Sequence, residues 1–221
     1  MIWISAAPHD ADFAMIDIAA STQNRILDAA TEHLRRVGYE RFRVIQVAAD
    51  LSMSHGNIYR HYPSKEALAD AVISRWLKDI ERTVLEAAGS PDPADDKLER
   101  MLFLIAQGYR TKSLEDAGLF AVFADAAAEE RVVARRHRTR IRELLERALE
   151  EGLANGVFGR RDTNTMTAFL FDLSYRFIHP QAVQLDSKAP EQSLRARREQ
   201  VFETLLRGLK TGGAQKAKTF N

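Results

Sequence analysis

Apolar residues recur every three or four positions along the chain from residue 21 onward, and no stretch alternates apolar and polar residues over the length of a strand. Spacing of three and four places side chains on one face of a helix, whereas alternation would place them on one face of a sheet. Glycine and proline interrupt the pattern at intervals and mark the ends of segments. We therefore expect an all-α fold.

The first helix is expected to begin at Ser21 or Thr22, either of which can cap it, and to end at Gly38. We expect residues 1–20 to form a loose tail. His33 lies on the apolar stripe of this helix. We interpret it as a hydrogen-bonded, half-buried histidine rather than as a ligand to a metal.

Later interruptions predict the remaining helices. Ser64 caps a long helix that continues to Gly89, and Pro180 ends a helix over residues 162–178. The last helix is expected over residues 191–210, before two glycines. Further helices are expected near residues 44–51, 55–61, 98–109, 119–128 and 133–151.

The composition excludes several classes of protein. An apolar share of 45% in 221 residues is too high for a disordered chain. The absence of cysteine excludes disulfide scaffolds, thiolate metal sites and cysteine nucleophiles. No apolar run approaches the roughly 20 residues of a membrane-spanning helix. We therefore expect no membrane partner and a cytoplasmic location.

Signals of catalysis and metal binding are absent from the sequence. The six histidines include no pair spaced by four residues, and the chain has no G-x-S-x-G, Walker A or G-x-G-x-x-G motif. We expect no metal, no cofactor and no enzymatic activity. The arginine-rich stretch over residues 131–142 contains or adjoins glutamates at helical pairing distance, so we interpret it as a solvated face.

Two short helices and a tight turn precede Pro63, and this arrangement can place the second helix in the major groove of DNA. The amino end of the second helix is small or polar, and Gly56 permits close approach of the backbone to DNA. His55 and Asn57 can read bases, whereas residues further along can hold phosphates. The predicted DNA-binding residues are Val44, Ser54, His55, Gly56, Asn57, Tyr59, Arg60, His61, Tyr62 and Lys65.

The segment over residues 22–68 resembles the amino-terminal DNA-binding domain of the TetR family, the tetracycline-repressor-like bacterial transcription factors. The resemblance begins with Gly38-Tyr39 and continues in unbroken order and spacing over more than twenty positions. The matching residues are Val47, Ala48, Met53, Ser54, Gly56, Ile58, Tyr59, His61, Tyr62, Ser64, Lys65 and Leu68. Two positions depart from the family pattern: Leu51-Ser52 stands in place of Ala-Gly in the turn, and Asn57 replaces the commoner Thr.

The resemblance implies a three-helix helix-turn-helix head joined to a larger helical domain that binds a small molecule and forms a homodimer. We accordingly divide the chain into four parts. They are a loose tail (1–20), a DNA-binding domain (21–66), an effector-binding and dimerisation domain (67–213) and a frayed tail (214–221).

The helix over residues 162–178 is apolar on both sides, so we expect one side to meet a partner subunit. The predicted dimer residues are Met166, Phe169, Leu170, Leu173, Phe177, Val201, Phe202 and Leu205. Polar residues interrupt the same helix and could orient an effector, although Asp172 could equally form a structural pair with Arg176. The predicted ligand residues are Phe103, Gln107, Phe120, Phe123, Asp172, Tyr175 and His179.

We therefore expect a transcriptional repressor that binds a palindromic double-stranded DNA operator as a homodimer and is released by a small, partly apolar effector. The alternative is a helical ligand-binding or scaffold protein without specific DNA binding. Salt dependence of DNA binding separates the two, because phosphate contacts release counterions.

Overall fold

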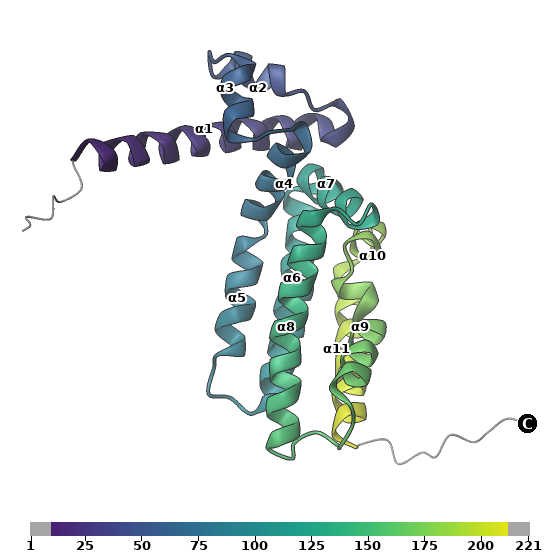
Figure 1. The fold of residues 1–221 in the computed structure, drawn as a ribbon. Coiled ribbons are helices and arrows are strands. Elements are labelled where there is room, and N and C mark those ends of the chain that lie inside the picture. The colour runs from purple at the N-terminus through teal and green to yellow at the C-terminus, as the bar shows by residue number, and fades with distance from the viewer. Residues whose placement is uncertain (1–9, 212–221) are drawn as a thin grey trace, which may run out of the picture. The chain divides into compact units, whose positions relative to one another are not determined.

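In the computed structural model, the structure describes residues 10–211, with side chains from residue 21 onward. These residues form helices and no strand, which confirms the all-α prediction (Figure 1). The internal contacts divide the chain between Val72 and Ile73 into two compact units. The expected tail over residues 214–221 lies outside the described residues.

The first unit contains α1 (Asp10–Arg41), α2 (Val44–Asp50), α3 (His55–His61) and the beginning of α4 (Lys65–Trp76). The positions of α2 and α3 agree with the helices expected from the sequence. Apolar side chains from all four helices and from the link before α2 fill one core. They include Ile26, Ala30, Leu34, Phe42, Val47, Ile58 and Leu68.

Helix α1 is longer than the sequence pattern predicts. It begins at Asp10, so the expectation of a loose tail is wrong for residues 10–20, while residues 1–9 lie outside the described part of the chain. No glycine or proline occurs between residues 10 and 37, so nothing there ends the helix. Gly38 breaks the helical geometry with φ 71° and ψ 174°, as expected of a helix-ending glycine.

His33 ties α1 to α2. Its Nε2 lies 2.7 Å from Asp50 Oδ2, and its Nδ1 lies 3.1 Å from a guanidinium nitrogen of Arg36. The arginine can only donate, so Nδ1 accepts and Nε2 donates to the aspartate. His33 is hydrogen-bonded as the sequence predicted, but with 3% of its surface exposed it is buried rather than half-buried.

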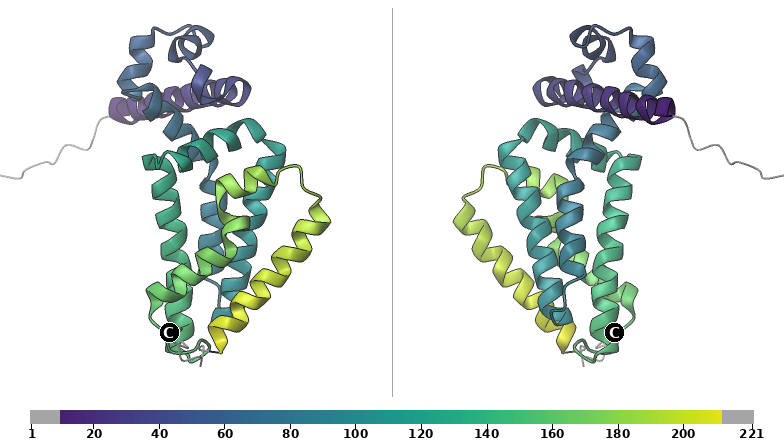
Figure 2. Two further views of the ribbon diagram at one scale, coloured as in Figure 1. Left: turned by 90° about the vertical axis from the view of Figure 1, so that its right-hand side faces the viewer. Right: turned by 90° about the vertical axis from the view of Figure 1, so that its left-hand side faces the viewer.

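The second unit contains the end of α4 and seven further helices. They are α5 (Lys78–Ala88), α6 (Ala94–Glu115), α7 (Ala117–Ala128), α8 (Val132–Ala154), α9 (Thr163–Ile178), α10 (Pro180–Leu185) and α11 (Glu191–Lys210). Helix α6 packs against α5, α8, α9 and α11, while α7 and α10 pack together at one end of these long helices (Figures 1 and 2). Lys97 of α6, which is buried, donates to both carboxylate oxygens of Glu151 in α8 at 2.9 and 2.7 Å.

Two helix boundaries in this unit differ from those expected. The single helix predicted from Ser64 to Gly89 is interrupted at Leu77, although the Leu77 N–H still donates to Ile73 O at 3.0 Å. Pro180 ends α9 but also begins α10, which the sequence did not predict. A proline fits the first position of a helix because its missing N–H would have no partner there. No helix among the described residues is long and apolar enough to cross a membrane.

Candidate functional site

The turn between α2 and α3 has a defined hydrogen-bonding pattern. The Met53 N–H donates to Ala48 O at 2.9 Å, and the Ser52 N–H donates to Ala49 O at 3.1 Å. These bonds close the end of α2 as a Schellman motif, which requires a left-handed residue after the helix. Ser52 supplies that residue with φ 52°, so this departure from the family pattern lies where a glycine would relieve strain.

The amino end of α3 is fixed by contacts within the chain on one side and exposed on the other. The Ser54 hydroxyl caps the helix by accepting from the Asn57 N–H at 3.2 Å, and Ile58 is fully buried. Gly56 is exposed, and a Cβ placed there would meet only Ser54 Oγ, at 3.9 Å. The fold of the chain therefore does not require a glycine at position 56.

A shallow groove of about 210 Å³ lies between the beginning of α2 and the exposed side of α3. His55 and Tyr59 form one side, with ring centroids 6.2 Å apart in an edge-to-face arrangement. Arg43 and Ile45, which the sequence interpretation missed, line the other side, and Ile45 is 65% exposed. Ile45 lies off the apolar face of α2, and an apolar residue at such a position is the sequence signal that could have revealed it.

Asn57 and Arg60 are joined on the same helix. An Arg60 guanidinium nitrogen donates to Asn57 Oδ1 at 2.8 Å, which leaves the amide NH₂ group of Asn57 available to a partner. A bidentate contact of this amide with adenine would require Arg60 to release the amide oxygen.

The remaining predicted DNA-binding residues are less accessible than expected. The Val44 side chain lines the groove but is largely buried, because it begins the apolar face of α2. His61 Nε2 is also buried and has no hydrogen-bond partner among the described residues. Lys65 Nζ lies 4.4 Å above the Tyr39 ring and 3.5 Å from Glu40 O, while Tyr62 caps the end of α3 and is half-buried.

In the second unit, a cavity of about 450 Å³ lies among α6, α7, α8 and α9. We call it the α6–α9 cavity. Four predicted ligand residues line it, namely Phe123, Asp172, Tyr175 and His179. Ile105, Ala134, Ile141 and Ile178 are among the residues that make its walls apolar.

Three predicted ligand residues do not line this cavity. Phe120 is buried in a cluster of aromatic rings, because its helix turns it toward Trp76 and Tyr109. Phe103 is 44% exposed, and the Arg198 guanidinium lies 5.0 Å above its ring. Gln107 donates to Thr111 Oγ1 at 3.3 Å. Spacing along α6 could not separate the face toward the cavity from the other faces.

His179 carries the clearest unmet polar group of this cavity. Its ring stacks on Tyr175 with centroids 4.4 Å apart, and its buried Nδ1 has no hydrogen-bond partner among the described residues. Burial, helped by the nearby charge of Arg138, lowers the pKa of His179 and favours the neutral ring. The alternative of an Asp172–Arg176 pair is not observed, because Arg176 instead pairs with Asp186 at 2.8 Å.

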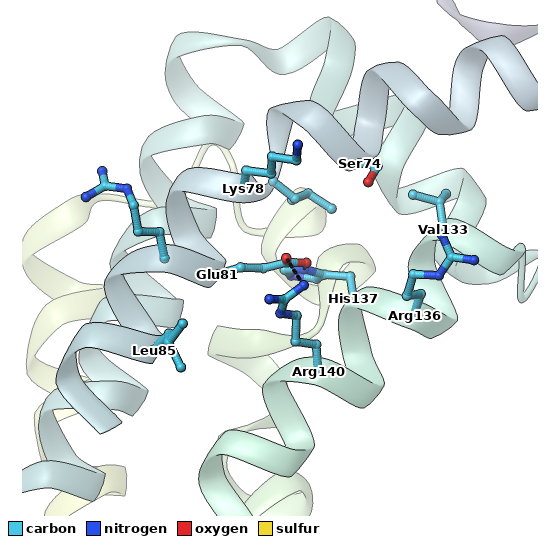
Figure 3. Close-up of a pocket in the computed structure, with 10 residues that line it drawn as sticks. Ser74, Lys78, Glu81, Leu85, Val133, Arg136, His137 and Arg140 are labelled. Atoms are coloured by element: carbon cyan, nitrogen blue, oxygen red, sulfur yellow. Dashed lines mark hydrogen bonds and ion pairs between the residues drawn. The ribbon is translucent and has the colours of Figure 1, made fainter. Parts of the chain in front are cut away.

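On the other side of α8, a polar pocket of about 330 Å³ lies between α5 and α8, with Ser74 and Leu77 at the junction of α4 and α5 (Figure 3). We call it the α5–α8 pocket. Glu81 and His137 meet in it, with Oε1 and Nδ1 2.7 Å apart. His137 Nε2 lies 2.9 Å from the hydroxyl of Tyr109, which lines the α6–α9 cavity. His137 lines both spaces.

The arginine-rich stretch is more than a solvated face. Arg138 pairs with Glu130 at 2.8 Å and Arg142 with Glu146 at 2.8 Å, as a solvated face would. However, Arg131 is buried, and two different faces of α8 direct arginines to the two different spaces. Arg135, Arg138 and Arg142 line the α6–α9 cavity, whereas Arg136 and Arg140 line the α5–α8 pocket.

Most of the predicted dimer residues lie inside the subunit. Five are buried in its core: Met166, Leu170, Phe177, Phe202 and Leu205. Phe169 and Val201 are half-buried, and Leu173 is exposed. Thr167 and Ser174 are fully buried. The face of α9 that meets the core therefore includes these small residues and is not centred on the predicted stripe.

Two family models match this chain. Residues 26–72 match the model for bacterial regulatory proteins of the tetR family, and residues 94–202 match a tetracyclin repressor-like C-terminal domain. Together these matches cover more than half of the chain.

Individual proteins agree with the family models. The HTH-type transcriptional repressor KstR of Rhodococcus jostii is 30% identical over 57% of this chain and 60% of its own length. The chain thus spans less than two thirds of that relative.

Solved structures share the fold. The TetR family regulator PfmR from Thermus thermophilus is 26% identical, with a TM-score of 0.54 over 84% of this chain and 98% of that one. FadR from Bacillus subtilis, solved in complex with stearoyl-CoA, is 18% identical, with a TM-score of 0.60 over 85% of this chain and 97% of that one. The fold, the helix-turn-helix and both family matches lead to one conclusion: the chain belongs to the TetR family of bacterial regulatory proteins.

Proposed function

We propose that this protein is a repressor that binds a palindromic operator as a homodimer and leaves it when a small, partly apolar effector binds. Gly56 is the observation that carries the DNA-binding part of this proposal. It is exposed at the amino end of α3 and has open space around it, so its lack of a side chain serves a partner outside the chain. A DNA backbone or base edge is such a partner.

The residues around Gly56 divide into two groups by chemistry. His55 and Asn57 offer hydrogen-bonding groups at the amino end of α3 and would read bases. Arg43, Tyr59 and Arg60 are exposed and would contact phosphates. Lys65 would support the site through its contacts with Tyr39 and Glu40, and the buried Val44 would contribute packing.

Dimerisation would align two copies of α3 on successive turns of the major groove, roughly 34–36 Å apart. Leu173 on α9 is exposed, and Phe169 and Val201 on α9 and α11 are only half-buried, so they remain available to a second subunit. The five predicted dimer residues that are buried would support α9 and α11 by packing in the core.

The α6–α9 cavity is the proposed effector site. Its walls are largely apolar, and Tyr175, Asp172 and His179 bring polar groups to it, which is the usual composition of a small-molecule site. FadR, which shares the fold, was solved with the partly apolar ligand stearoyl-CoA. Effector and operator would weaken each other's binding by the same factor, because the coupling is reciprocal.

Selection from a library of randomised DNA duplexes tests this function. The full chain should enrich one sequence with two inverted half-sites, and affinity for it should fall steeply as salt rises. Analytical ultracentrifugation of the complex should give two chains per duplex. Failure to enrich any sequence at low salt would favour the scaffold alternative and overturn the proposal.

A further inference from the structure

The α5–α8 pocket concentrates positive charge in a chain that is nearly neutral overall. Its lining includes Lys78, Arg82, Arg136 and Arg140 but only one acidic residue, Glu81, whereas the whole chain carries a formal net charge of +1. Leu77, Leu85 and Val133 also line the pocket and shield part of it from water. Charges in such a partly apolar recess interact more strongly than charges on an open surface.

Two of the four cations have no hydrogen-bond or ion-pair partner in the part of the chain that the structure describes. Arg82 pairs with Glu86 at 3.0 Å, and Arg140 lies 3.5 Å from Glu81. Lys78 and Arg136 form no hydrogen bond or ion pair among the described residues. Figure 3 shows both around the recess that holds Glu81 and His137, with the Ser74 hydroxyl facing it.

Glu81 offsets only part of this positive charge, because a single carboxylate faces four cations and already contacts His137 and Arg140. Burial raises the pKa of Glu81. The hydrogen bond and charge of His137, together with the charges of Arg140 and Lys78, lower this pKa by more than burial raises it, so the net effect is a lowered pKa. The carboxylate therefore stays ionised and accepts from His137 Nδ1. Lys78 and Arg136 remain available to an anion from outside.

We propose that the α5–α8 pocket binds an oxyanion group, a phosphate or a carboxylate, as a ligand site separate from the α6–α9 cavity. The planar guanidinium of Arg136 would hold two oxygens in parallel, and Lys78 would contribute a compact charge from the facing helix. The Ser74 hydroxyl would donate a further hydrogen bond.

The same pocket is connected to the α6–α9 cavity through His137. The chain of contacts runs from Glu81 in the pocket to Tyr109 in the cavity, and all its hydrogen-bond distances are 2.9 Å or less. An anion that attracts Arg140 away from Glu81 would change the charge facing His137 and so the strength of the hydrogen bond between His137 Nε2 and the Tyr109 hydroxyl. Oxyanion and cavity ligand are then expected to alter each other's affinity.

Calorimetric titration of the full chain with inorganic phosphate and with citrate, at constant ionic strength, tests the site. Saturable binding of one ligand per chain is expected, and the stronger arm identifies phosphate or carboxylate as the preferred group. Arg136→Gln should weaken binding at least tenfold and Lys78→Gln severalfold. Arg160→Gln is the matched control. Arg160 is exposed, and its substitution removes the same charge outside the pocket.

A spectroscopic readout follows the connection to His137. Phosphate or citrate should shift the ring ¹⁵N resonances of His137 in the wild type but not in Arg136→Gln. Equal weakening by Arg136→Gln and Arg160→Gln, or no saturable binding in either arm, would overturn the site. These titrations contain no DNA, so their failure would leave the proposed repressor function untouched.

Discussion

Gly56 in the first unit and Gly152 in the second show how differently the two parts of the chain use the same residue. A Cβ at Gly56 would find open space, whereas a Cβ at Gly152 would lie 2.2 Å from the buried ring of Phe158. Gly152 is therefore required by packing inside the chain. Gly56 is not, and we propose that it serves DNA binding instead. The comparison separates residues that build the fold from residues that meet a partner.

The largest effect is expected from Gly152→Ala. The added methyl group would force the Phe158 ring out of its place in the core, and overpacking of this kind costs about 3 kcal/mol. Urea unfolding would measure the loss. Gly89→Ala is the control, because its nearest neighbours lie at 3.7 Å, and a comparable loss in that variant would contradict the packing argument.

Gly56→Ala should weaken DNA binding without lowering the stability of the fold. The free energy of unfolding should stay the same or rise slightly, because alanine favours a helix over glycine. Affinity for the selected operator should fall tenfold or more, since the methyl group would occupy space needed by DNA. Fluorescence anisotropy and urea unfolding measure the two quantities, and unchanged DNA affinity would remove the distinction between the two glycines.

A smaller, stabilising effect is expected from Ser52→Gly. The residue lies in the left-handed region with φ 52°, where glycine avoids the strain of a side chain. The free energy of unfolding of the variant should be higher by about 0.5–1 kcal/mol. The gain is this small because the entropy of glycine in the unfolded chain offsets part of the relieved strain. Operator affinity should not change. Destabilisation would show that the turn does not hold this geometry in solution.

The smallest effect is expected in the pH dependence of the second unit. The folded pKa of Glu81 is lowered, so its contribution to stability is present above the unfolded value of 4.5 and is lost as pH falls through the lower folded value. Glu81→Gln should therefore flatten the decline of stability below that pH. Urea midpoints from pH 6 to pH 3 would measure it, and equally steep curves would contradict the assigned role of His137 and Arg140.

The two units also differ in how well the sequence predicted them. In the first, the functional groups lie on two adjacent short helices, and their spacing fixes which side chains share a face. The placement of α2 and α3 and the break at Gly38 both follow from that local pattern. Only packing against the core revealed that Val44 and His61 Nε2 turn inward.

In the second unit, the cavity is built by four consecutive helices, and which of their faces line it depends on how the helices pack against one another. Periodicity shows that α9 is apolar on both sides but not which side meets the core. Burial of Thr167 and Ser174 decided that question, and no pattern of apolar residues indicates it. The pairing of Arg176 with Asp186 depends on α10, a helix that the sequence did not predict.

The absence of cysteine from the chain permits the most direct test of how α3 meets DNA. An Asn57→Cys variant should form a disulfide with a thiol tethered to a base edge in the major groove of the selected half-site, while Arg160→Cys should not. The same Asn57→Cys variant should react far less with a thiol tethered in the minor groove. Equal reaction in both grooves, or none in the major groove, would contradict the placement of α3 against DNA.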